Sequence, residues 1–237
     1  MSVLAAIGWG AFASASLYIG QALGRSFRVV GLVMGFGAGT LLSAVAYELV
    51  PERSFQEGWG IAVAFLVGAL VYYGADRLID SRGGAKRQHI AGGEEGSGPA
   101  MFLGALLDGL PESFILGISL ALGGSVSIAF VAAVFVSNIP QGLAGTTSLQ
   151  AAGYPDRRIF WMWTALTATS AACAAAGFLL ADSVPDQGVH AEAFAAGAVL
   201  VMLADSMMPE AFRHGGNSVG LLTVLGYLAA AALTVLQ

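Results

Sequence analysis

Two acids lie inside a long apolar segment, and their types and spacing suggest chemistry. Asp108 and Glu112 flank a proline, Pro111. Residues four apart share one face of a helix, and charges within a membrane-spanning segment are costly and usually functional. Proline lacks an N–H group and frees a backbone carbonyl one turn earlier. The stretch therefore indicates a cation site made of two carboxylates and a backbone oxygen.

A second polar stretch surrounds Pro140, which follows Pro111 by 29 positions. Ser137 and Gln141 are four residues apart, and Asn138 lies beside them. If the two segments pack antiparallel, their polar faces meet and form a set of oxygen donors: two carboxylates, two amide oxygens and a hydroxyl. Carboxylates must be deprotonated to hold a metal. We therefore expect cation binding to weaken as pH falls.

The acids could instead form hydrogen bonds with hydroxyl groups of neighbouring helices. Ser119, Thr146, Thr147 and Thr167 lie in apolar segments and could supply those hydroxyls. Hydrogen-bond networks of this kind occur between membrane helices, but their members are more often uncharged. The pair of acids therefore favours the cation site.

The composition is that of an integral membrane protein. Of the 237 residues, 57% are hydrophobic and 11% are charged, and the mean hydropathy is +0.75. The formal net charge is -5, and no basic patch suggests a nucleic acid partner. The single cysteine, Cys173, excludes an intramolecular disulfide.

Eight apolar segments are long enough to cross a bilayer, which takes about 20 residues. We therefore predict an all-α integral membrane protein that forms a single transporter domain over residues 1–237. The connection at 79–99 is rich in glycine and charge and is predicted to be a flexible cytoplasmic loop. The expected helices cover residues 3–23, 29–50, 59–78, 100–122, 126–148, 159–181, 189–208 and 217–236.

The positions of the basic residues predict the orientation. Nine of the ten flank odd-numbered connections between the expected helices, and Arg53 alone lies on the other side. The positive-inside rule then places both termini outside the plasma (inner) membrane. The nine are Arg25, Arg28, Arg77, Arg82, Lys86, Arg87, Arg157, Arg158 and Arg213.

An internal repeat relates the two ends of the chain. A shift of 158 places aligns a phenylalanine, small residues and a Pro-Glu pair in the second and seventh expected helices. These helices must run in opposite directions, so we predict a 3+2+3 inverted repeat around the central helix pair. Such repeats point to a transporter with a site near the membrane midplane. The aligned residues are Phe36, Ala38, Gly39, Leu42, Ala46, Pro51 and Glu52 with Phe194, Ala196, Gly197, Leu200, Ala204, Pro209 and Glu210.

Acidic residues end the two related helices on opposite sides of the membrane. Glu48 and Glu52 end the second helix, and Asp205 and Glu210 end the seventh. Negative potential at a mouth concentrates cations, so these acids could line a path into and out of the site. They could equally be interfacial acids exposed to water. Among them, Asp205 is the strongest functional candidate.

Three tryptophans lie near the ends of the expected third and sixth helices. They are Trp59, Trp161 and Trp163. Tryptophan is enriched where membrane meets water. We expect all three to lie in such interfacial belts.

These features together resemble the ZIP (Zrt-/Irt-like) family of divalent metal permeases. The likeness covers nearly the whole chain: eight helices, a long connection after the third, and proline-centred motifs in the fourth and fifth. The motifs are Asp108-Gly109-Leu110-Pro111-Glu112-Ser113, Ser137-Asn138-Ile139-Pro140-Gln141-Gly142 and the stretch from Ala204 to Ala211.

The ligands implied by the resemblance differ from those usual in the family. Asp108 stands where the fourth helix usually has His, and Gly109 stands where it has Asn, whereas Glu112 keeps the acid. In the fifth helix Ser137 replaces His or Gln, and Gln141 replaces Glu. Asn138 keeps the polar group that is usual at its position in the fifth helix. Two other positions depart from the family: Glu48 replaces a common His of the second helix, and Ser170 aligns with a Glu of the sixth.

The resemblance implies a secondary or facilitative transporter of a divalent metal cation such as Zn, Mn or Fe, not an enzyme. Oxygen donors alone favour harder ions over zinc, and the reduced charge favours a single-ion site. The resemblance further implies a homodimer, no prosthetic group, and alternating access in which helices 1, 4, 5 and 6 move against the rest. The alternative is a divergent scaffold that transports a non-metal solute or acts as a sensor.

Overall fold

The computed structural model describes residues 2–22, 27–49, 58–81, 97–123, 127–181 and 188–236, and within these ranges every regular element is helical. Eight helices in this part of the chain are long and apolar enough to cross a membrane. The prediction of an all-helical membrane protein with eight spans is therefore confirmed. Glu52, Arg53, most of the connection expected at 79–99, and the turn after the fourth span lie outside the described residues.

The helix bounds follow the predicted segments closely, with two extensions. Helical structure reaches Ser81 and resumes at Ser97, so it enters both ends of the expected connection. The seventh span continues to Gly215, because Pro209 stands in the first turn of a helix, where its missing N–H costs no hydrogen bond. The elements are α1 (Val3–Ala22), α2 (Phe27–Ala44), η1 (Val45–Leu49), α4 (Trp59–Ser81), α5 (Ser97–Gly123), α6 (Ile128–Ala151), α7 (Asp156–Leu180), α8 (Val189–Met202), η5 (Leu203–Met207), α9 (Met208–Gly215) and α10 (Ser218–Leu236).

A capping serine and two glycines in tight turns mark where helices begin and end. The Ser127 side chain accepts a hydrogen bond from the Phe130 N–H at 3.1 Å and so begins α6. Gly153 (φ 82°) joins α6 to α7, and Gly216 (φ 65°) joins α9 to α10. Both glycines adopt positive φ, which other residues adopt only with strain. These tight turns reverse the direction of the chain, and each connected helix then packs mainly on other helices.

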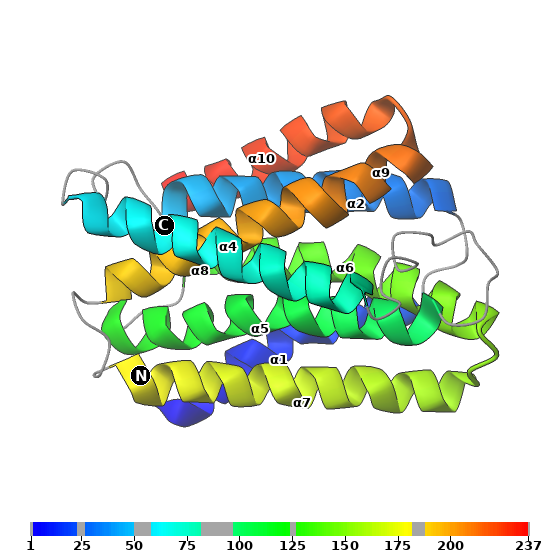
Figure 1. Cartoon of the computed structure of the whole chain (residues 1–237), viewed down its shortest axis with the longest axis horizontal. Coiled ribbons are helices and arrows are strands. Elements are labelled where there is room, and N and C mark those ends of the chain that lie inside the picture. The colour runs from blue at the N-terminus through cyan, green and yellow to red at the C-terminus, as the bar shows by residue number, and fades with distance from the viewer. Residues whose placement is uncertain are drawn as a thin grey trace.

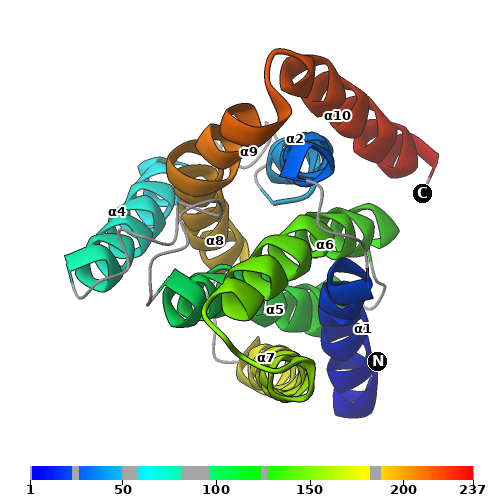
Figure 2. The ribbon, with the colours of Figure 1, turned by 90° about the vertical axis from the view of Figure 1, so that its right-hand side faces the viewer.

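The helices form two groups that lie side by side (Figures 1 and 2). In one group α1 packs on α6 and α7, and α5 packs on α7 and α6; we call it the site bundle. In the other group α2 packs on α10 and α9, and α4 packs on α8; we call it the flanking bundle. The two bundles meet where α6 lies against α2 and α10 and where α5 lies against α8, with a slight contact between α5 and α4.

Close backbone approach joins α2 to α10 in the flanking bundle. A Cβ atom at Gly39 would collide with the carbonyl oxygen of Thr223. On the opposite helix, a Cβ at Gly226 would collide with the carbonyl oxygen of Phe36. Small residues allow membrane helices to approach this closely, and the gain in contact stabilises the pair. Each helix thus has one glycine that packs against the backbone of the other.

The α4 and α8 helices repeat the same reciprocal contact. A Cβ at Gly197 would collide with the carbonyl oxygen of Phe65, and a Cβ at Gly68 would collide with that of Phe194. These four residues are related to the four of the α2 and α10 contact by a shift of 158 places. Phe36 and Gly39 of α2 correspond to Phe194 and Gly197 of α8. Thr223 and Gly226 of α10 correspond to positions 65 and 68 of α4. The offset read from the sequence therefore relates two helix interfaces as well as residue types.

Two π-helical turns are also separated by 158 residues. The π-helix η1 begins at Val45 and the π-helix η5 begins at Leu203, so a shift of 158 places superimposes Val45–Leu49 on Leu203–Met207. π-Helical turns are rare and occur mostly inside α-helices, often near functional sites. The two long helices of the flanking bundle therefore share a register, an interface and a distortion.

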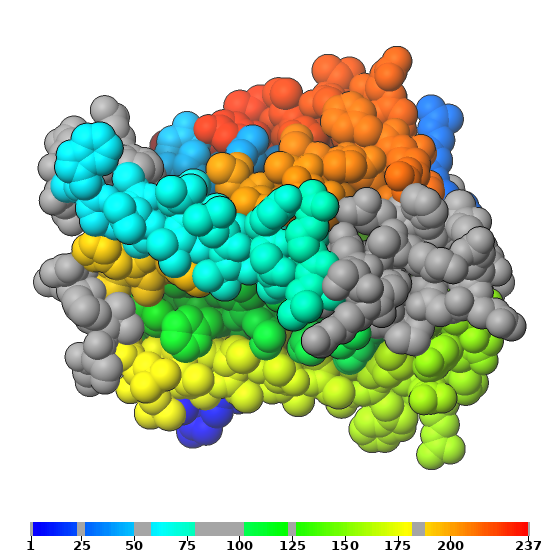
Figure 3. Space-filling view, viewed as in Figure 1, coloured from blue at the N-terminus to red at the C-terminus, as the bar shows by residue number. Residues whose placement is uncertain are grey.

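Much of the outer surface is apolar. Leu66 (58% exposed) and Leu70 (59%) lie on α4, and Leu221 (71%) lies on α10. Figure 3 shows α4 running across one face of the molecule, with α9 on one side of it and α5 and α7 on the other. Exposed apolar surface of this extent fits contact with lipid and not with water.

The prediction of an interfacial position is wrong for one of the three tryptophans, Trp163. Trp59 and Trp161 are 88% and 58% exposed, but Trp163 is completely buried. Its indole N–H donates to the Thr146 hydroxyl at 3.0 Å. Trp163 lies two residues beyond Trp161, so it points to a different face of α7, toward α6, and finds its polar partner inside the protein.

Candidate functional site

Asp108 and Glu112 lie near the middle of α5, one helical turn apart. Glu112 is only 1% exposed, and Asp108 is half-buried. Pro111 lies within the helix and has no N–H to donate to the carbonyl of Leu107. This turn of α5 therefore holds two carboxylates and a backbone oxygen without its helical partner.

Three helices meet at the Asp108 carboxylate. The hydroxyl of Tyr72, which comes from α4, donates to Asp108 Oδ1. The Gln141 side chain, which comes from α6, donates through Nε2 to Asp108 Oδ2 at 3.4 Å. Each carboxylate oxygen thus faces a donor on a different helix.

Three buried oxygen atoms near this contact have no hydrogen-bond donor within the described part of the chain. They are both carboxylate oxygens of Glu112 and the amide oxygen of Gln141. A buried acceptor with no donor costs free energy comparable to a lost hydrogen bond, and more for a charged group. All three atoms are oxygen donors of the kind that hard divalent cations bind. A cation between α5 and α6 would satisfy them.

Ser137 and Asn138 are both buried, but their recorded contacts lead elsewhere. The Ser137 hydroxyl donates to the carbonyl of Val134 in its own helix at 2.9 Å. The Asn138 amide donates to the carbonyl of Ala13 in α1 at 3.3 Å. The structure therefore joins Gln141 to Asp108, whereas Ser137 and Asn138 bond to other partners.

The hydroxyl groups considered as alternative partners of the acids are engaged elsewhere or point away. Ser119 donates to Glu192 at 3.0 Å, and Thr147 donates to the carbonyl of Leu143 at 2.8 Å. Thr146 accepts the bond from Trp163. The Thr167 hydroxyl is buried without a partner. Among the described residues none of these hydroxyls makes a recorded hydrogen bond with either acid of α5.

The acids at the helix ends have different environments. Glu48, within η1, is half-buried and accepts a hydrogen bond from Thr234 at 2.7 Å. Asp205, within η5, is exposed. Glu210 is 5% exposed and contacts His214 at 2.7 Å and Arg213 at 3.5 Å. The second acid of the first pair, Glu52, lies outside the described residues.

Three residues near these groups were not singled out from the sequence. Tyr72 contacts Asp108, Glu192 accepts the Ser119 bond, and Asp76 is 5% exposed one turn after Tyr72. The signal for Asp76 and Glu192 was available, since each is an acid inside an apolar span. Nothing in the sequence indicates which face of α4 carries Tyr72 toward α5.

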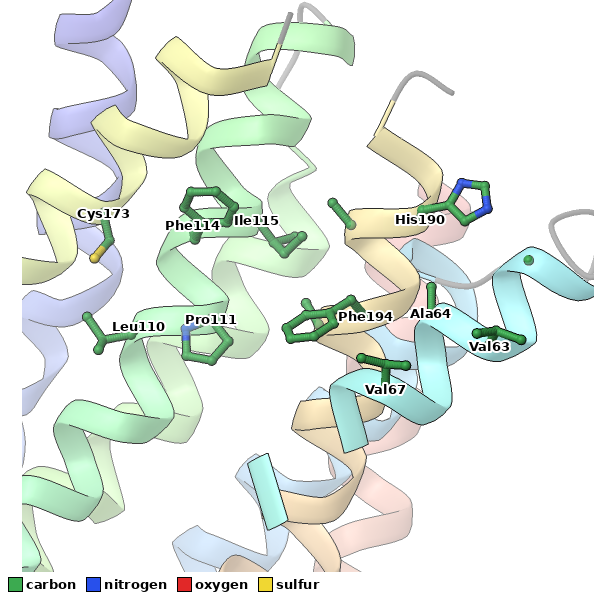
Figure 4. Close-up of a pocket in the computed structure, with 13 residues that line it drawn as sticks. Val63, Ala64, Val67, Leu110, Pro111, Phe114, Ile115, Cys173, His190 and Phe194 are labelled. Carbon is green, nitrogen blue, oxygen red and sulfur yellow. The ribbon is translucent and has the colours of Figure 1, made fainter. Parts of the chain in front are cut away.

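An apolar groove of about 730 Å³ lies on the other side of Pro111 (Figure 4). Leu110, Pro111 and Phe114 of α5 form one wall, and the residues opposite come from α4 and α8. Neither Asp108 nor Glu112 lines it. The groove therefore lies between α5 and parts of α4 and α8, and the two acids of α5 are not among the residues that line it.

Metal-binding clusters of the usual composition are not found in the part of the chain that the structure describes. No three His, Cys, Asp or Glu side chains come together there as a metal ion would need. The candidate set instead combines two carboxylates with an amide oxygen.

The fold and the site define an integral membrane protein with eight apolar helices in its described part and two acids one turn apart on one of them, α5. No family model matches the chain. An Arabidopsis thaliana protein named "Putative zinc transporter" is 26% identical over 193 residues, which cover 79% of this chain and 31% of that protein. The chain thus spans about a third of the length of this curated relative, and the similarity supports a relationship with zinc transporters.

Proposed function

We propose that this protein transports a divalent metal cation across a membrane, with Zn²⁺ as the first candidate, through a site between α5 and α6. The observation that carries the proposal is Glu112, a carboxylate that is 1% exposed and lies beside a second acid. Neither of its oxygens has a hydrogen-bond donor among the residues that the structure describes. A cation would compensate this cost. The similarity to a protein named as a zinc transporter supports the same function.

Asp108, Glu112 and Gln141 are the first ligands in this proposal. Asn138 and Ser137 lie on the same helix as Gln141 and complete the set if α6 turns or the Ala13 contact opens. Oxygen ligands without imidazole or thiolate accept manganese and iron as well as zinc. Glu48, Glu52, Asp205 and Glu210 would attract the cation at the two mouths.

Alternating access is the proposed mechanism. Glu112 is sealed, so a cation reaches its oxygens only after helices separate. The seam between the site bundle and the flanking bundle offers a place for such a movement. A 3+2+3 inverted repeat is supported by the offset shared by the glycine contacts and the π-helices. The distribution of basic residues supports termini outside the plasma (inner) membrane, and the family resemblance supports a homodimer.

Flux into proteoliposomes tests the proposal. The full chain would be reconstituted with an entrapped metal sensor and given Zn²⁺, Mn²⁺, Fe²⁺, Cd²⁺ or Co²⁺ in turn. We expect saturable uptake of at least one ion, and we expect the double variant Asp108→Asn/Glu112→Gln to lose it while remaining folded. No flux of any of these ions through folded protein would contradict the proposal.

A further inference from the structure

The Tyr72 side chain is one point where the flanking bundle touches the candidate cation site, and it contacts the Asp108 carboxylate directly. Tyr72 lies on α4, is 4% exposed, and donates its hydroxyl to Asp108 on α5. The α4 helix packs mainly on α8 and only lightly on α5, and the apolar groove separates much of the two helices. The hydroxyl of Tyr72 therefore crosses the seam at the level of the site.

The two donors on Asp108 hold different carboxylate oxygens. The Tyr72 hydroxyl donates to Oδ1, and the Gln141 amide lies 3.4 Å from Oδ2, near the limit for a hydrogen bond. The amide oxygen of Gln141 is buried with no donor. A cation would therefore displace the weak amide donor first and use the free amide oxygen after the amide rotates. Tyr72 can keep its bond throughout, because a carboxylate oxygen bound by one donor leaves the other oxygen for the metal.

We propose that Tyr72 is a positioning residue for the transported cation: its hydroxyl holds Asp108 Oδ1, so that Oδ2 faces the cation, and it does so only while α4 lies against α5. This inference rests on the proposed function. Outer partners that orient a ligating carboxylate typically change metal affinity 10- to 100-fold when removed. The affinity of the site would thus be high when the bundles are joined at Tyr72 and lower when α5 has moved away from α4.

Equilibrium binding of Zn²⁺ to the purified full chain in detergent tests the assignment. We expect Tyr72→Phe to raise the Kd about 10- to 100-fold. The matched control is Tyr73→Phe on the same helix: Tyr73 is 41% exposed, and its ring, which lies against Arg77, is kept by the substitution. We expect this control to bind like the unmodified chain.

A double-mutant cycle separates positioning from a general effect on structure. In an Asp108→Asn background we expect Tyr72→Phe to cause little further loss, because the two residues act through one contact. Equal losses in both backgrounds, or an unchanged Kd in Tyr72→Phe alone, would overturn the inference. If the unmodified, folded chain binds no Zn²⁺ or other divalent cation, the proposed function itself fails.

A second measurement covers the case in which Tyr72→Phe does not fold. 3-Fluorotyrosine placed at position 72 keeps the ring and hydroxyl and supplies a ¹⁹F resonance. We expect this resonance to shift during a Zn²⁺ titration with the Kd measured by binding. A resonance that stays fixed while Zn²⁺ binds would place the cation away from the Tyr72 contact and overturn the assignment.

Discussion

Replacing Glu112 with glutamine separates the charge of this residue from its shape. The attraction between a divalent cation and one carboxylate about 4 Å apart is roughly 8 kcal/mol at an effective dielectric of 20, twice the value for two unit charges. Desolvation takes back several kcal/mol of this. A net loss of about 3 kcal/mol remains, which corresponds to roughly 100-fold weaker binding.

The metal-free protein should respond differently to the same change. Neither Glu112 oxygen accepts a hydrogen bond, so the amide loses no partner, and its NH₂ group can donate to the neighbouring Asp108 carboxylate. We therefore expect the melting temperature of Glu112→Gln without metal to stay level or rise. A substitution that weakens metal binding without weakening the fold is the mark of a ligand.

Thermal unfolding with and without Zn²⁺ measures both effects. At a concentration 100 times the Kd, a ligand that binds only the folded state stabilises it by about 2.7 kcal/mol, and a 100-fold weaker site leaves about 0.4 kcal/mol. The matched control is Glu192→Gln, because Glu192 is partly buried but accepts a bond from Ser119 away from the pair. A Glu112→Gln variant that keeps the full Zn²⁺-dependent shift, or a Glu192→Gln variant that loses it equally, would refute the reasoning.

Three other changes test separate parts of the structure. Gly68→Ala should lower the melting temperature or prevent folding, because its Cβ would collide with the Phe194 carbonyl. The control Gly74→Ala, on the same helix, meets open space and should be neutral. Equal thermal stability of the two variants would contradict the glycine contact. Zn²⁺ affinity should fall between pH 8 and pH 5, because protons compete for carboxylate ligands, and a flat titration would argue against them. Asp108→His should raise the preference for Zn²⁺ over Mn²⁺ in a competition assay, since imidazole suits zinc better than oxygen does, and an unchanged ratio would remove Asp108 from the ligands.

The spans and the acid pair could be predicted from the sequence, whereas the partners of the acids could not. Length and hydropathy determine where helices cross a bilayer, and a spacing of four places Asp108 and Glu112 on one face. Successive residues of a helix point about 100° apart, so Asn138 turns to Ala13 of α1, whereas Gln141 reaches Asp108 of α5. Ser137 shares the face of Gln141 but bonds to the carbonyl of Val134 in its own helix. Which neighbours these are depends on how α6 is rotated against α1, α2 and α5. Residue types in α6 alone do not determine that rotation.

The same limit explains Tyr72 and Trp163. Both are large side chains in apolar helices, and composition alone is compatible with lipid, an interface or the interior for each. Tertiary contacts decide: Tyr72 reaches Asp108 and Trp163 reaches Thr146. The alignment by 158 places could be found from the residue types. The π-helical turns η1 and η5 have no residue signature, so only the structure shows that they fall at matching positions.

The matched π-helical turns bear on how such a chain could have arisen. A π-turn accommodates one more residue than the α-helix around it. If an ancestral unit was doubled to give the two halves, the additional residue at Val45–Leu49 and Leu203–Met207 was already present in that unit. Deleting one residue from either turn would restore regular α-helical winding while the residues beyond it keep nearly the same face. The π-turns at Val45–Leu49 and Leu203–Met207 are therefore local widenings of the helix, placed at the same point of each half, that do not change which side chains face the neighbouring helices.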